Sequence, residues 1–124
     1  MKRLTLLSLF CLLTNLALAQ APAVATSDPK LDSLAKLSQR YINSQQSDSL
    51  YALMGSAFKK EVSADQMKKV AEGLSAQLGK WVSYESTGVK DGIGSYKATF
   101  AQMALNFYIS RDKEGKVETF LFKP

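Results

Sequence analysis

The spacing of apolar residues changes once along this chain, at Gly79 and Lys80, and this change constrains the fold more than any other feature. Before it, apolar residues recur at intervals of three and four, as on one face of an α-helix. After it, apolar and polar residues alternate, as in strands with one buried face. Helices followed by a run of short strands are typical of the α+β class.

Three helical segments are predicted before Gly79. The first begins at Pro29, which suits the first turn of a helix, and ends at the polar residues 43–47. The second is shorter, carries the apolar residues of 50–54, and is broken by Gly55. Phe58 is expected to be a buried anchor in an irregular stretch beyond the break.

The third helix has signals at both of its ends. Ser63 and Gln66 have the spacing of a capping box, in which each side chain satisfies the backbone N–H of the other residue. Gly79 is expected to close the helix. Its apolar face is formed by five residues, Met67, Val70, Ala71, Leu74 and Leu78.

Four strands are predicted after Gly79, in an antiparallel meander with the helices covering one face of the sheet. Asp91-Gly92 is a strong signal for the first hairpin turn, and residues 112–115 form a second polar turn. The strands are 81–90, a second containing Tyr96, Ala98 and Phe100, a third containing Leu105, Phe107 and Ile109, and a fourth from Val117 to Phe122.

The N-terminus has the pattern of a secretion signal. Lys2 and Arg3 precede the apolar run 4–18, and Ala17-Leu18-Ala19 supplies the small residues of a cleavage site before Gln20. The run is shorter than a membrane-spanning helix, so a stable membrane span after cleavage is not expected; an uncleaved N-terminal anchor is the alternative. The prediction is therefore a signal peptide at 1–19, a flexible lead-in at 20–28 and one domain at 29–124. Such a protein would be exported, to the periplasm or the medium of a bacterium.

The composition excludes much familiar chemistry. The chain has no histidine, and Cys11, its one cysteine, lies in the predicted signal peptide. Metal sites, thiol chemistry and most acid–base sites use these residue types, so neither a metal nor a cofactor is expected. The net charge is +5, but basic residues are interleaved with acids, which argues against a nucleic-acid partner.

Two stretches, YINSQQSDSLYALMGSAFKKEVSADQMKKVAEGLSAQLGKW and DGIGSYKATF, together with the closing DKEGKVETFLFKP, resemble the bacterial domain of unknown function numbered 3887. The resemblance covers roughly 31–124. It implies a cone-shaped fold similar to nuclear transport factor 2, with helices packed on one face of a curved four-stranded antiparallel sheet. It also implies an association with cell-envelope serine hydrolases or β-lactamase-like proteins. At 101–103 the chain lacks the glycine that is common in that turn of the family.

Aromatic residues in the predicted strands are the leading candidates for a binding surface. Large apolar groups occur on both faces of the third and fourth strands, and an apolar face left uncovered usually marks a ligand or partner site. Burial in the core is the competing interpretation for each of them. The candidate surface consists of Trp81, Tyr108, Glu118, Phe120 and Phe122.

These observations favour an exported, non-catalytic binding or interaction module. Its ligand would be a small apolar molecule or a protein partner, and a homodimer through the sheet is a separate hypothesis. The alternative is a small cofactor-free enzyme of isomerase or hydratase type, using a carboxylate and a tyrosine in an apolar pocket. Glu118 alternates with Phe120 and Phe122, so it is the first candidate for that carboxylate. The competing interpretation is a solvent-facing glutamate that pairs with a nearby lysine.

Overall fold

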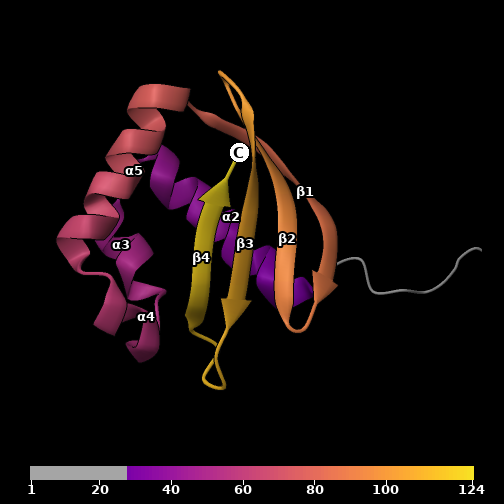
Figure 1. Ribbon diagram of the computed structural model, residues 1–124. Helices are drawn as coiled ribbons and strands as arrows, with labels where there is room; N and C mark the ends of the chain where they lie inside the picture. Colours follow the sequence, from indigo (N-terminus) through magenta and orange to yellow (C-terminus); the bar gives the residue numbers. More distant parts are fainter. Residues whose placement is uncertain (1–27) are drawn as a thin grey trace, which may run out of the picture.

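A computed structural model describes residues 28–124 and confirms the α+β class (Figure 1). The predicted signal peptide, 1–19, and nearly all of the predicted lead-in lie outside the described residues. Four helices precede four strands. They are α2 (Pro29–Asn43), α3 (Ser47–Ala52), α4 (Ser56–Glu61), α5 (Ala64–Leu78), β1 (Trp81–Lys90), β2 (Ile93–Phe100), β3 (Ala104–Arg111) and β4 (Val117–Lys123).

The strands form one curved, open antiparallel sheet in the order β1-β2-β3-β4, so β1 and β4 are its edges. Figure 1 shows α2 crossing one face of this sheet, while α5 stands beside β4. The helix α2 contacts β1 and β3, whereas α4 contacts β4. The helix α5 packs mainly on α2 and α3. The helices therefore cover one face, as the sequence predicts.

The local signals place most element ends where they are expected. Asp28 caps α2 by accepting from the N–H groups of Lys30 at 2.9 Å and Leu31 at 3.3 Å. The capping box of Ser63 and Gln66 is present at the start of α5. The turn between β1 and β2 is formed by Asp91 and Gly92, both with positive φ, as a tight hairpin of right-handed twist requires.

The stretch after Gly55 differs from the prediction, because residues 56–61 form the helix α4 instead of an irregular segment. Alanine, lysine and glutamate in this stretch are good helix formers, and two turns need no long periodic pattern. Phe58 is half-buried, and its ring meets that of Phe120 edge-on with centroids 6.5 Å apart. Phe58 thus anchors α4 to β4.

The core lies between the helices and one face of the sheet. On β2, Tyr96, Ala98 and Phe100 alternate toward this face and are buried. Phe107 and Ile109 of β3 are fully buried on the same face. Cross-strand pairing places Phe122 opposite Phe107 and Phe120 opposite Ile109, and opposed residues share a face of the sheet. Both β4 phenylalanines therefore point toward the helices.

A bulge at the start of β4 breaks the simple alternation of that strand. Ser110 pairs with Thr119 and Arg111 with Val117, so Glu118 is an extra residue in β4. Because of it, Val117 and Phe120 both face the core although they are three residues apart. Glu118 is therefore exposed and does not lie among the aromatic residues, where simple alternation with Phe120 and Phe122 placed it.

Candidate functional site

The five residues of the predicted surface are placed in three different environments. Trp81 is fully buried, and Phe120 and Phe122 are half-buried on the helix side of the sheet. Tyr108 lies opposite Leu121 and Ser95, on the outer face. Glu118 projects at the bulge. The structure thus brings Trp81, Phe120 and Phe122 together and separates Tyr108 and Glu118 from them.

Trp81 is the centre of an aromatic cluster and not part of a surface. Its ring stacks on Phe100 with centroids 5.4 Å apart, and meets Phe107 at 5.3 Å and Phe122 at 5.4 Å edge-on. The indole Nε1–H donates to the carbonyl of Ser83 at 2.8 Å. A tryptophan with this contact area and a satisfied N–H is a core anchor.

The outer face of the sheet does not carry the continuous apolar patch that the two-faced strands suggested. The residues that point outward from β2, β3 and β4 include Lys97, Asn106 and Lys123, which pair across the sheet and are exposed. Tyr108 is half-buried there, and Leu121 is 43% exposed. The reason is that Phe120 and Phe122 are on the other face.

The apolar opening of the molecule lies instead between β4 and the helices α4 and α5. It is a groove of about 410 Å³, within the size range of small-molecule sites. We call it the β4–α5 groove. Its lining consists of Phe58, Val62, Met67, Lys69, Val70, Gly73, Leu74, Gln77, Leu78, Phe120, Leu121 and Phe122.

Two walls of the β4–α5 groove come from residues whose apolar character was visible in the sequence. Val70 belongs to the predicted apolar face of α5 but is 43% exposed, because α5 packs on α2 and α3 and leaves this side of its apolar face uncovered. Leu121, also 43% exposed, forms the opposite wall. The α5 stripe has the width of an ordinary core-facing helix stripe, so the sequence carried no signal that could have located the groove.

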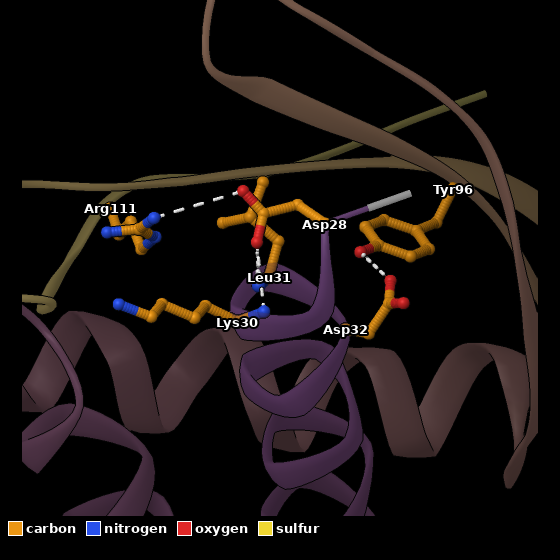
Figure 2. A network of polar contacts seen from close by, with 6 residues as sticks. All are labelled: Asp28, Lys30, Leu31, Asp32, Tyr96 and Arg111. Atoms are coloured by element: carbon orange, nitrogen blue, oxygen red, sulfur yellow. Dashed lines mark hydrogen bonds and ion pairs between the residues drawn. The ribbon is translucent and has the colours of Figure 1, made fainter. Parts of the chain in front are cut away.

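A polar network at the other side of the domain ties the start of α2 to the sheet (Figure 2). The hydroxyl of Tyr96 donates to Oδ1 of Asp32 at 2.6 Å. Arg111 forms an ion pair with Asp28 at 3.9 Å. Burial raises the pKa of Tyr96, and the hydrogen bond to Asp32 raises it further.

The acidic residues are spread over the surface. All eleven lie in the described part of the chain, and each is exposed or half-exposed. Glu118 borders a surface hollow that Arg111, Asp112, Lys113 and Glu114 also line, away from the aromatic cluster. Asp32 accepts a hydrogen bond from the buried Tyr96. This bond joins the start of α2 to β2 and therefore has a structural role.

The Tyr96 pair leads to a prediction about alkaline stability. The folded state holds the phenolic proton more tightly than the unfolded chain, whose tyrosines titrate near pH 10. The contribution of Tyr96 to the free energy of unfolding is therefore complete below pH 10 and is lost as the pH rises above it. Chemical denaturation from pH 8 to pH 11 should show that Tyr96→Phe reduces the alkaline loss by up to about 1.4 kcal/mol per pH unit above pH 10.

The matched control is Tyr108→Phe, which removes a hydroxyl from the outer face, away from Asp32. This variant should keep the alkaline loss of the unaltered protein. Burial, with a contribution from the charge of Asp32, also raises the pKa of Tyr84, so a smaller loss should persist in Tyr96→Phe. An alkaline loss of equal slope in Tyr96→Phe and the unaltered protein would contradict the role given to Tyr96.

Residues 28–124 were searched for metal sites and membrane spans. No group of three or more acidic, histidine or cysteine side chains in this part lies close enough together to hold a metal ion. No helix there has the length and apolar character needed to cross a membrane.

Comparison with protein-family models, curated proteins and solved structures found no match to this chain. The resemblance to the domain of unknown function 3887 and to the cone-shaped fold therefore stays a prediction.

Proposed function

We propose that this protein is an exported binding module that holds an apolar ligand or chain segment in the β4–α5 groove. One observation carries the proposal, which is an open apolar hollow built on packed elements. Ligand pockets in proteins are typically hollows of this kind, lined mostly by apolar side chains with a few polar groups. Phe120 and Phe122 give the hollow a firm floor, since their rings pack on each other at 5.5 Å and on Phe107.

The proposed cellular location and class of partner protein come from the sequence. The pattern of residues 1–19 is that of a secretion signal, so the module would act outside the bacterial cytoplasm. The resemblance to the 3887 family adds that it could serve as an accessory to a cell-envelope serine hydrolase or a β-lactamase-like protein. We also propose that the domain belongs to the cone-shaped class, on the basis of its curved sheet and its helix layer.

Gly73 offers a direct test, because it lines the β4–α5 groove and a Cβ placed there meets nothing within 4 Å. Gly73→Leu should therefore fill the groove without disturbing the core. We expect it to weaken binding of the apolar fluorophore 1-anilinonaphthalene-8-sulfonate about tenfold, equal to about 1.4 kcal/mol. The measurement is a fluorescence titration of the folded protein.

Gly73→Ala is the matched control. It adds one methyl group, should leave the groove open, and should raise the stability of α5 by about 0.8–1 kcal/mol through helix propensity. Its affinity for the fluorophore should equal that of the unaltered protein. If Gly73→Leu binds the fluorophore as well as Gly73→Ala does, the groove is not the binding site and the proposal fails.

A further inference from the structure

The edge of β4 that faces the groove is a free sheet edge. The lining includes three consecutive residues, Phe120, Leu121 and Phe122. Successive side chains of a strand point to opposite faces, so a hollow lined by all three must lie over the edge of the strand. Only the start of this edge is covered in the described part of the chain, where Val117 exchanges backbone hydrogen bonds with Leu53 and Gly55.

The backbone groups on this edge can be identified from the face that each side chain occupies. On one strand, residues with side chains on the same face direct their N–H and C=O groups to the same edge. Val117 faces the core and directs both groups away from β3, toward 53–55. Phe120 and Phe122 also face the core, and the extra residue Glu118 shifts side-chain face and peptide direction together, so their peptide groups point away from β3 as well.

The hydrogen bonding of β2 leads independently to the same assignment. Phe100 faces the core, and its N–H donates toward β3, to the carbonyl of Met103 at 2.8 Å. Core-facing residues of β3 therefore point back to β2, and those of β4 point outward. The peptide groups of Phe120 and Phe122 thus open into the β4–α5 groove.

The wall opposite this edge is the stripe of α5 formed by Lys69, Val70, Gly73, Leu74 and Gln77. At its middle, Gly73 leaves open space where any other residue would place a side chain. Lys69 is the one charged residue of the lining. Within residues 28–124 neither an acid nor any hydrogen-bond acceptor pairs with its ammonium group.

We propose that the occupant of the β4–α5 groove is an extended peptide segment that adds to the free edge of β4 as a fifth strand. This inference rests on the proposed function and names the class of its ligand. An alkyl chain would satisfy the apolar walls but would bury the peptide groups of Phe120 and Phe122 without partners, which is costly. A strand supplies those partners and places alternate side chains against α5.

Charge complementarity selects among such peptides. An acidic side chain or a terminal carboxylate at the end near Lys69 would pair with the free ammonium group, in a protein whose net charge is positive. The segment is therefore apolar at alternate positions and acidic at one end.

The probe is a seven-residue peptide, equal in length to β4, that alternates valine and threonine and ends in glutamate. Two analogues replace the amide N–H groups by ester oxygens, one at all valines and one at all threonines. Only one set can face β4. We expect esters in that set to weaken Kd about tenfold through the loss of hydrogen bonds, and esters in the other set to have less than about twofold effect. A loss with the valine set means antiparallel addition, and a loss with the threonine set means parallel addition.

A second measurement follows the amides of Phe120 and Phe122 by hydrogen exchange. Saturation with the peptide should slow their exchange about tenfold, because both become hydrogen-bonded. Lys69→Glu should weaken binding of the peptide that ends in glutamate and strengthen binding of the same peptide ending in lysine. Lys68→Glu is the matched control, since it makes the same change of net charge on α5 outside the lining and should alter neither.

Laurate serves as the competing occupant. If it binds, Gly73→Leu blocks it, and neither peptide binding nor amide protection is found, the strand-addition inference is overturned while the proposed function stands. Equal effects of the two ester sets would overturn the inference as well. If Gly73→Leu changes the binding of neither laurate nor the peptide, both the inference and the proposed function fail.

Discussion

Trp81→Ala is expected to lower the free energy of unfolding by about 3–5 kcal/mol, the range for removing a large aromatic side chain from a packed core. The indole is fully buried and is in ring contact with Phe100, Phe107 and Phe122. Its removal therefore leaves a cavity whose walls are large, stiff rings on three strands. Such walls cannot collapse far, so the cost should lie toward the upper end of the range.

Urea denaturation followed by circular dichroism measures this loss, since the variant has no tryptophan to report by fluorescence. Trp81→Phe is the control, because it retains an aromatic ring and leaves a smaller cavity. It should cost about half as much as Trp81→Ala, as expected when only part of the buried volume is removed. A loss below about 1 kcal/mol in Trp81→Ala would contradict the placement of Trp81 at the centre of the core.

Asn43→Ala is expected to have the second-largest effect, a loss of about 1–3 kcal/mol. The side chain of Asn43 accepts from the N–H of Trp81 at 2.8 Å and donates to its carbonyl at 2.9 Å. It thereby closes two hydrogen bonds between the end of α2 and the start of β1. Alanine leaves the N–H of a buried residue without this acceptor, and an unsatisfied buried group carries the full cost of its desolvation.

Gln39→Ala is the matched control for Asn43→Ala. Gln39 also donates to the carbonyl of Trp81, at 2.9 Å, but it makes no bond to the N–H. Its removal leaves the carbonyl with Asn43 as donor, so the loss should be below about 1 kcal/mol. Thermal unfolding of the two variants side by side tests the ranking, and a larger loss in Gln39→Ala would refute the assigned role of Asn43.

Much of the fold could be predicted from the sequence, because its signals are local. The capping box at Ser63, the Asp91-Gly92 turn and the alternation in 96–100 each act over a few residues and are all present as expected. The helix α4 was missed because Phe58 is the one large apolar residue in its sequence SAFKKE, so no periodic spacing is visible there. The bulge at Glu118 was missed because a bulge depends on how β4 pairs with β3.

The candidate site was less accessible to sequence analysis. An aromatic strand residue has the same local pattern whether it faces a core, a ligand or solvent, so Trp81, Tyr108 and Phe120 were indistinguishable. Val70 and Leu74 belong to the apolar face predicted for the third helix, and nothing in that pattern shows whether another element covers them. The groove depends on the placement of α5 relative to β4, and the packing of distant elements decides that placement.

The sequence by itself determined the order of helices and strands, the α+β class and the absence of histidine chemistry. Each of these depends on residue type and on spacing along the chain. Only the tertiary structure decided which face each aromatic ring occupies and that the edge of β4 lies open beside α5. The physical reason is that a strand edge and a groove are created by the packing of elements far apart in sequence, here α5 and β4, whose separation no local pattern encodes.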